Sequence, residues 1–196
     1  MKRTVITLTI LAILVALPIT VTVNAADQPS WGTNNGSQVL VTFKADGFDL
    51  GNGWTSLGKV CTFTMPGVNF TQAFGYVGAS HGIWTLDGGM AMNWNGGDYA
   101  FLGVMADVPF GRCLWSTEVD NMFNTYQEQY FWSGIDVNYT VFGGRTLFFG
   151  PQVEAIRIGN TCAQVGAHLG LEKIQFGIYC GDRGYNARVN ITVPLN

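Results

Sequence analysis

The residues with the clearest chemical potential are 78–82, which read Gly-Ala-Ser-His-Gly. They fit G-x-S-x-G, the pattern that lifts a serine nucleophile onto a sharp turn between a strand and a helix in α/β-hydrolases. Asp136 and His168 follow in the chain order of such a triad. However, residues 83–89 (Ile-Trp-Thr-Leu-Asp-Gly-Gly) have the composition of a strand and a turn, not of the helix that the elbow requires. We therefore interpret the motif as a turn between two strands, assign no catalytic residue and expect no enzyme.

Metal and cofactor chemistry also lacks a matching pattern. Asp46, Asp49 and Asn52 lie in a Gly-rich turn and offer oxygen ligands for calcium, but their spacing is not that of an EF-hand loop. No C-x-x-C occurs, and His81 and His168 do not have the spacing of zinc ligands. No P-loop, dinucleotide fingerprint or haem motif is present. We expect no metal and no cofactor, with His168 neutral and hydrogen-bonded, or facing a pore, in mid-strand.

The N-terminal segment has the layout of an export signal, and the predicted structural elements begin after it. Lys2 and Arg3 precede a long apolar run, which Pro18 interrupts and a Val-Asn-Ala triplet ends. An uncleaved anchor helix is the competing interpretation, because the run approaches the length that spans a bilayer. Pro18 and the cleavage-like triplet favour removal. We expect a signal peptide over residues 1–25 and a single β-rich domain over 26–196.

The charge balance of the remaining chain argues against nucleic acid as a partner. Removing Lys2 and Arg3 from the 10 basic residues leaves 8, against 13 acidic residues. No basic cluster is present to bind phosphates. Charged residues make up 12% of the chain, about half the usual share of a soluble domain. No later apolar stretch is long enough for a membrane helix.

Alternation of apolar and polar residues with a period of two runs through most of the chain and predicts β-strands. Turn residues such as Gly, Pro, Asn and Asp separate the alternating segments. About nine to eleven strand-like segments result, among them 39–45, 57–65, 68–76, 90–94, 99–108, 131–142 and 146–158, followed by three more from 161 onward. We predict an all-β, up-and-down antiparallel meander of about 8–10 strands closing into a barrel, with a β-sandwich as the alternative.

One segment departs from this alternation and has the spacing of a helix. Thr117 and Asp120 resemble a capping pair. The apolar residues that follow at helical spacing are Val119, Met122, Phe123, Tyr126 and Tyr130. We expect either one short helix near 117–130 or a long excursion between strands.

The last thirty-five residues predict three consecutive strands with a defined register. If Glu172 and Lys173 form a two-residue turn, Leu169 lies opposite Phe176, and closure of the next hairpin places Phe176 opposite Val189. One apolar face then continues across all three strands, and a slip of one residue would reverse it. The opposite face is rich in Gly and neutral polar residues, so the apolar face meets either a protein core or a membrane.

The cysteines predict disulfides without defining their pairing. An exported chain with an even number of cysteines favours bridges, and four cysteines allow three pairings. The register places Cys180 beside Val165 and points Cys162 to the other face, which disfavours a Cys162–Cys180 bridge unless a bulge intervenes. The pairing of Cys61, Cys113, Cys162 and Cys180 therefore stays open.

Four sequons have the N-x-S/T pattern, at Asn35, Asn69, Asn138 and Asn190. In a glycosylating host they would mark solvent-exposed positions. The chain is rich in Asn and Thr, so chance accounts for them equally well.

Residues 99–196, and most clearly those from Phe131 onward, resemble the small outer-membrane β-barrels of bacteria, the class of OmpA-like transmembrane domains. The shared features are the export signal, strands with an apolar and a Gly/polar face, short turns, many aromatics and a final alternating strand. The chain departs from that class by ending in Leu195-Asn196 without an aromatic residue, by its four cysteines, and by the stretch before Val68, which has no place in an eight-strand count. The resemblance implies an outer-membrane location, contact with membrane lipid, and a structural, adhesive or narrow-passage role.

The rival interpretation is an exported soluble β-sandwich at the cell surface. It would serve as a subunit of a surface layer or extracellular filament, or as a carbohydrate-binding module. The sequons, the cysteines and the strand over 99–108, which is apolar on both faces, favour it. A sheet buried on one face shows the same alternation as a barrel wall, so alternation alone does not separate the two interpretations. The lack of charge on the polar face over 164–179 favours the barrel. A homo-oligomer or a surface assembly is compatible with the sequence, which does not define the oligomeric state or a ligand.

Overall fold

The computed structural model describes residues 36–45, 47–65, 70–93, 98–123, 128–158, 160–182 and 184–195. The expected signal peptide over 1–25 and the sequons at Asn35 and Asn69 lie outside these residues. Among the described residues, no helix is long and apolar enough to cross a membrane.

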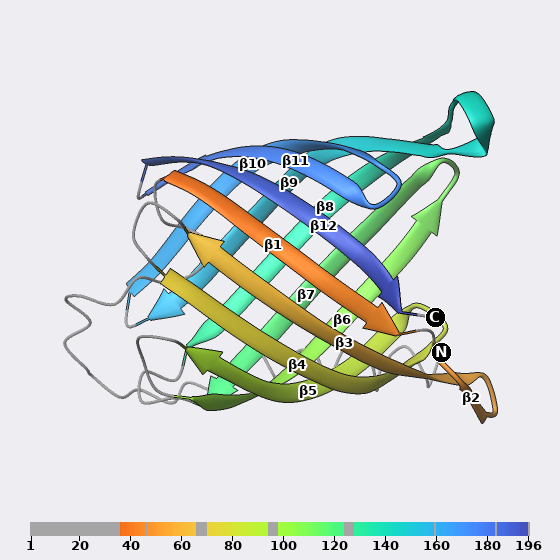
Figure 1. The fold of residues 1–196 in the computed structure, drawn as a ribbon, viewed down its shortest axis with the longest axis horizontal. Coiled ribbons are helices and arrows are strands. Elements are labelled where there is room, and N and C mark those ends of the chain that lie inside the picture. Colours follow the sequence, from red (N-terminus) through yellow and green to blue (C-terminus); the bar gives the residue numbers. More distant parts are fainter. Residues whose placement is uncertain are drawn as a thin grey trace, which may run out of the picture.

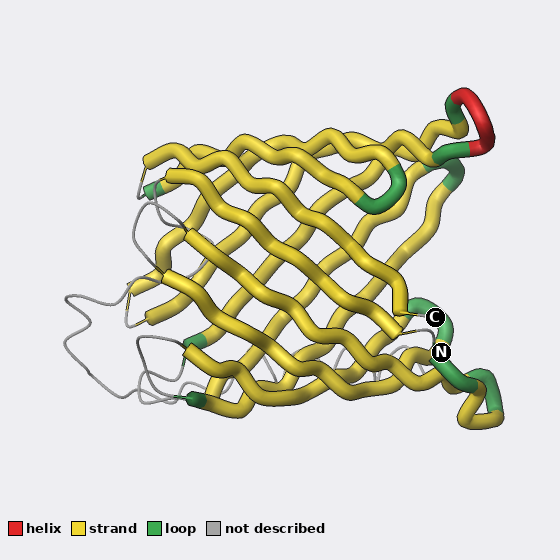
Figure 2. Tube along the Cα trace, in the orientation of Figure 1, coloured by secondary structure: helices red, strands yellow, loops and turns green. Residues whose placement is uncertain are grey.

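Nearly all described residues belong to β-strands (Figure 2). A short 3-10 turn, η2 (Phe142–Gly144), interrupts the series. The strands are β1 (Gly36–Ala45), β2 (Asp49–Gly51), β3 (Trp54–Met65), β4 (Phe70–His81), β5 (Trp84–Asn93), β6 (Tyr99–Phe110), β7 (Cys113–Phe123), β8 (Gln129–Thr140), β9 (Thr146–Ile158), β10 (Asn160–Leu171), β11 (Ile174–Gly181) and β12 (Gly184–Leu195).

Eleven of these strands, β1 and β3–β12, form one closed barrel, and β2 adds a short hairpin to the start of β3 (Figure 1). Each strand pairs antiparallel with the next, whereas β1 pairs antiparallel with β3 and parallel with β12. The parallel pair follows from the odd number, because each antiparallel step reverses direction and an eleventh strand arrives pointing the same way as the first. The predicted barrel is confirmed, and the sandwich alternative is wrong because a single sheet closes on itself.

The register predicted for the C-terminal strands is confirmed. Leu169 pairs with Phe176, and Phe176 pairs with Val189 on its other side. The two-residue turn at 172–173 is present, with Glu172 at φ 56°. The apolar face of this meander points outward, since Phe176 and Ile178 are well exposed, while His168 and Tyr179 are buried inside. The Gly-rich, polar face of these strands therefore lines the interior of the barrel.

The short helix predicted near 117–130 is wrong. Residues 113–123 form β7, β8 begins at Gln129, and residues 124–127 lie outside the described part. Ser116, Glu118, Asp120 and Met122 point into the barrel. Three of these inward residues are polar, so the two faces of β7 do not differ clearly in polarity and the strand alternation is hidden in the sequence. The helical spacing of the remaining apolar residues is a coincidence.

The predicted disulfides are also wrong: all four cysteines lie in the described residues and are free thiols. They belong to four strands, β3, β7, β10 and β11. Cys162 and Cys180 are on neighbouring strands, but Cys162 packs against the interior cluster and Cys180 faces outward beside Val165. Residues on opposite faces of a sheet cannot meet the short Cβ separation that a disulfide needs.

Part of the interior is filled by aromatic and other apolar side chains from β3 to β9. Phe74 and Phe101 meet edge to face with ring centroids 6.2 Å apart, and Tyr76 approaches Phe101 to 4.5 Å. The full cluster is Cys61, Phe63, Met65, Phe74, Tyr76, Ala91, Tyr99, Phe101, Met122, Tyr130 and Ile156. This explains why the strand over 99–108 looked apolar on both faces: the inward side chains of Tyr99 and Phe101 join this cluster, and its outward residues lie on the wall.

Candidate functional site

The most extensive polar arrangement in the barrel is centred on Glu154 of β9 and Arg188 of β12. Both guanidinium Nη atoms donate to the two carboxylate oxygens, with Nη2 2.8 Å from Oε2. Glu154 is 1% exposed and Arg188 5%. A buried charge is tolerated only when it is paired and hydrogen-bonded, and the two-pronged geometry meets that requirement.

Neutral side chains from several strands complete this network. Gln164 Nε2 donates to Glu154 Oε2 at 2.5 Å, and the hydroxyl of Tyr130 donates to Oε1 at 3.3 Å. Arg188 Nε donates to Gln38 Oε1 of β1 at 2.9 Å, and its guanidinium carbon lies 4.8 Å from the Tyr179 ring. The network therefore links β1 and β12, the two strands of the parallel seam, to side chains of β8, β9, β10 and β11 inside the barrel.

A second charged cluster surrounds Lys59 of β3. Its Nζ lies 3.6 Å from Asp87 Oδ2, 3.6 Å from Glu118 Oε1 and 4.0 Å from the centre of the Tyr76 ring. Asp120, 2% exposed, lies on the same face of β7 as Glu118. One ammonium thus faces three carboxylates.

Two of these carboxylates converge on Gly103 of β6. A Cβ at Gly103 would overlap Oδ1 of both Asp87 and Asp120. Neither of these oxygens has a hydrogen-bond partner. If all three carboxyl groups were ionised, Lys59 would compensate only one of the negative charges. Among the described residues, no group of three His, Cys, Asp or Glu side chains is arranged to hold a metal ion.

The hydrolase-like residues are only partly brought together. His168 Nε2 and Asp136 Oδ1 form a hydrogen bond inside the barrel, between β10 and β8. Ser80 lies at the end of β4, where its hydroxyl is 2.8 Å from that of Thr85 across the β4–β5 hairpin. The turn at 82–83 leads directly into β5, with Gly82 at φ 59°, so the motif forms a β-hairpin and not a strand–turn–helix elbow.

The calcium-like turn is only partly within the described residues, because Asp46 lies outside them. Asp49 Oδ1 accepts a hydrogen bond from the Gly51 amide at 2.7 Å, and Asn52 adopts φ 53°. These contacts are those of a tight turn. Of the remaining sequons, the side-chain amide of Asn138 donates to the Arg112 carbonyl at 3.4 Å, and the side-chain amide of Asn190 donates to Gln175 Oε1 at 2.8 Å.

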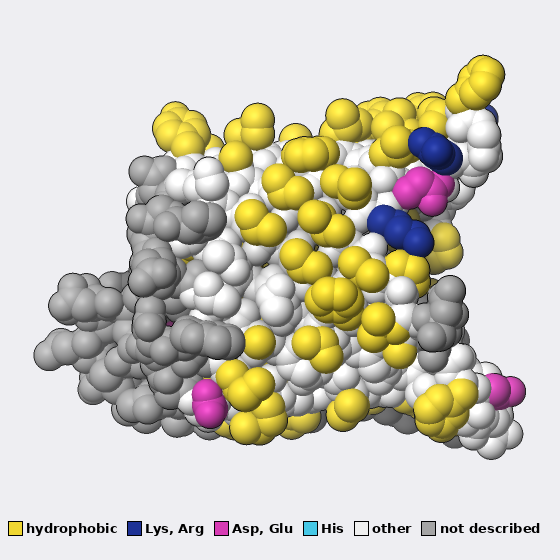
Figure 3. All heavy atoms as spheres, viewed as in Figure 1, with side chains coloured by type: hydrophobic (Ala, Val, Ile, Leu, Met, Phe, Trp, Pro, Cys, Tyr) yellow, Lys and Arg dark blue, Asp and Glu magenta, His cyan; other side chains and the backbone are white. Residues whose placement is uncertain are grey.

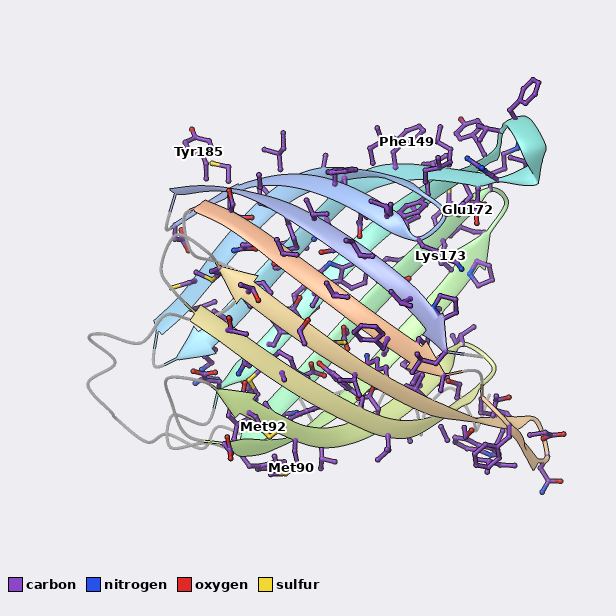
Figure 4. All side chains as sticks on the ribbon, in the orientation of Figure 1. Met90, Met92, Phe149, Glu172, Lys173 and Tyr185 are labelled. Atoms are coloured by element: carbon purple, nitrogen blue, oxygen red, sulfur yellow. The ribbon has the colours of Figure 1, made fainter. Side chains whose placement is uncertain are left out.

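The outer wall of the barrel is apolar, and Figure 3 shows hydrophobic side chains across the visible face with charged ones toward its ends. Met90, Met92, Phe149 and Tyr185 point away from the barrel (Figure 4). Arg157, near the end of β9, is the one charged side chain on the outward face of the described barrel strands.

Exposed aromatic side chains concentrate toward the ends of the wall strands. One end carries Phe110, Trp115, Tyr139 and Phe149, and the other Phe123, Phe131 and Tyr185. Aliphatic residues such as Val77, Leu102 and Val165 lie between them. An apolar band between two aromatic girdles, around a polar interior, is the pattern of membrane-spanning barrels.

The sequence interpretation missed the charged interior clusters. Each of these clusters is built from charged residues on the inward face of an alternating strand: Lys59, Glu118, Glu154 and Arg188. A charged residue on that face was the sequence feature that could have indicated a buried charged cluster. Glu154 and Arg188 are 34 residues apart in the chain, so nothing local pairs them.

The fold and its two faces define a class: a closed, eleven-stranded β-barrel with polar networks inside and an apolar wall outside. Comparison of the chain with protein-family models, with curated proteins and with solved structures found no match. The β-barrel part of the resemblance is therefore confirmed by the structure, and the narrower outer-membrane family stays a prediction.

Proposed function

We propose that the protein is an integral β-barrel of the outer membrane, with a structural role at the cell surface. The observation that carries this proposal is the inverted distribution of side chains: an apolar wall, with Arg157 as its one charged side chain among the described barrel strands, around a charged and hydrogen-bonded interior. In water such a wall would expose a continuous apolar surface far larger than monomeric soluble proteins tolerate. In a bilayer it is the favourable arrangement.

Strand length and closure support the same proposal. β4, β6, β8 and β10 have 12 residues each, somewhat more than the roughly 9–11 tilted residues that cross a bilayer. Closure leaves no unpaired strand edge, which a lipid environment requires because it offers no hydrogen bonds to the backbone. The odd strand number and parallel seam differ from the even, antiparallel barrels of bacterial outer membranes; the outer-membrane location rests on the export signal of the sequence.

The interior favours a structural role over bulk transport. The Glu154–Arg188 network and the aromatic cluster are buried and fixed by mutual contacts. A wide aqueous channel needs inward side chains that remain hydrated.

The decisive experiment places an arginine on the wall. Val165 is the sixth of the twelve residues of β10 and Leu102 the fourth of the twelve in β6, and both face outward. In phosphatidylcholine vesicles, Val165→Arg should lower the free energy of unfolding by about 2–4 kcal/mol, because it would bury a charge near the bilayer midplane, and Leu102→Arg should lower it by a smaller amount, because that position is closer to one end of the strand. Ile83→Arg, in the exposed turn between β4 and β5, is the matched control and should change it by less than about 0.5 kcal/mol.

If both wall variants are as stable as the control, or if the exported protein is recovered in the soluble fraction without detergent, the membrane proposal is wrong. Fractionation of a native host into inner and outer membranes then tests the outer-membrane location separately.

A further inference from the structure

One end of the barrel carries three cationic turns side by side. We call this arc the basic rim: turns 111–112 (β6–β7), 141–145 (β8–β9) and 172–173 (β10–β11). Each contributes one exposed cation: Arg112, Arg145 and Lys173. None of the three takes part in an ion pair within the described part of the chain.

Backbone hydrogen bonds hold the three turns in place. The Asn138 amide of β8 donates to the Arg112 carbonyl at 2.8 Å, and the Thr192 amide of β12 donates to the Lys173 carbonyl at 2.8 Å. The Thr146 amide donates to Glu172 Oε1 at 2.7 Å, while the Glu172 amide donates to the Thr146 carbonyl at 2.8 Å. Glu172, the carboxylate of the basic rim, is therefore held by the Thr146 backbone and forms no ion pair, so the three turns carry three cations against one carboxylate.

Aromatic side chains lie directly beside these cations. Tyr139 and Phe149 are stacked with ring centroids 5.8 Å apart, and the Arg112 guanidinium carbon lies 5.6 Å from the Tyr139 ring. Phe142, at the tip of turn 141–145, is fully exposed. Figure 4 shows Phe149 on the wall beneath this hairpin and Glu172 and Lys173 at the neighbouring turn.

The opposite end has a different charge. Its described turn residues and strand ends present the exposed side chains of Asp98, Asp182 and Arg157. Asp182 Oδ2 accepts a hydrogen bond from the Ala163 amide at 2.8 Å. Among the described residues, the basic rim therefore gathers three cations without an ion pair, whereas the opposite end has two exposed carboxylates and one arginine. Lys44 of β1 and Asp49 of the β2 hairpin are also exposed at the end of the basic rim.

We propose that the basic rim binds the phosphate groups of anionic lipid headgroups at the bilayer surface. This inference rests on the proposed membrane location, and it adds that the end of the barrel with the basic rim is the end that contacts anionic lipid. Arginine and lysine at a membrane surface are attracted to anionic headgroups by about 1 kcal/mol each. Tyr139 and Phe142 have the amphipathic or apolar character that anchors a barrel at the interface between headgroups and acyl chains.

The test compares lipid selectivity in reconstituted vesicles. Quenching of tryptophan fluorescence by brominated phosphatidylglycerol and by brominated phosphatidylcholine measures the preference for the anionic lipid, and Trp115 on the adjacent wall reports on this end. We expect the unmodified barrel to prefer phosphatidylglycerol and the Arg112→Gln/Arg145→Gln/Lys173→Gln variant to lose most of that preference, at roughly fivefold per cation. Arg157→Gln at the opposite end is the matched control and should retain it.

The inference is overturned if the triple variant keeps the preference or if Arg157→Gln loses as much. It is also overturned if inorganic phosphate, added at constant ionic strength in place of chloride, abolishes the preference, since the rim would then bind a soluble anion. Insertion into pure phosphatidylcholine vesicles separates the two proposals: every variant should insert, and failure of the unmodified protein to do so refutes the membrane location itself.

Discussion

Glu154 of β9 and Arg188 of β12 form a two-pronged ion pair inside the barrel, across two intervening strands. Through Gln38, the same arginine reaches β1 on the other side of the parallel seam. The pair therefore lies where it can hold the closing strands in one register. A buried pair of this kind adds little net stability over an apolar replacement, but breaking it is costly.

Removing the negative charge alone should destabilise the barrel strongly. Glu154→Gln keeps the shape of the side chain but leaves Arg188 buried without a counter-charge, so we expect a loss of about 3–5 kcal/mol in the free energy of unfolding. Urea unfolding in detergent micelles measures it. The double variant Glu154→Leu/Arg188→Met removes both charges and should recover most of the loss; a double variant as unstable as the single one would contradict this explanation.

Removing one buried carboxyl group near Lys59 should instead raise the free energy of unfolding. Asp120 is buried and its Oδ1 has no donor, so Asp120→Asn removes a buried carboxyl group beside Asp87 and supplies an amide donor toward it. We expect a gain of roughly 1–2 kcal/mol in the free energy of unfolding at neutral pH. Asp98→Asn, exposed at the end of the barrel, is the control and should change little. A loss of stability in Asp120→Asn would mean that the carboxylate is satisfied in solution.

Glycines inside the barrel make room for aromatic rings. A Cβ at Gly166 would overlap both the Tyr179 ring and the Ile178 carbonyl, whereas a Cβ at Gly75 meets nothing within 4 Å. Gly166→Ala should therefore cost about 1–3 kcal/mol through overpacking. Gly75→Ala should be neutral or slightly stabilising, because it only reduces the freedom of the unfolded chain. Equal effects at the two positions, measured by the same urea unfolding, would show that both the Tyr179 ring and the Ile178 backbone move aside.

The thiols should be reduced and unequal in reactivity. All four are free in the structure, so the unfolded protein should titrate four thiols without added reductant. In the folded barrel Cys61 is buried, with its Sγ 3.4 Å from Thr42 Oγ1, and should react only on unfolding. Cys180 is exposed and should react first. Fewer than four thiols in the unfolded, unreduced protein would instead support a disulfide.

The predicted helix and disulfides failed for different reasons. The helix was inferred without knowing which residues of 113–123 face inward, whereas the disulfides were inferred from the export signal and the even number of cysteines, even though the register already placed Cys162 and Cys180 on opposite faces. Thr117 and Asp120 look like a helix cap in one dimension, but Asp120 belongs to an inward row near Lys59 of a distant strand. The fold brings Asp136 and His168 together as a hydrogen-bonded pair. They do not form a triad with Ser80, because the Ser80 hydroxyl pairs with Thr85 at the end of β4.

The sequence by itself determined the strands and their local pairing. Alternation with a period of two and short turns were enough to set Leu169 opposite Phe176 and Phe176 opposite Val189, because hairpin register depends only on nearby residues. Only the tertiary structure decided which face of that meander points inward, the number of eleven strands, the parallel β1–β12 seam and the meeting of Glu154 with Arg188. These depend on closure of the whole sheet, which joins residues that no local pattern connects.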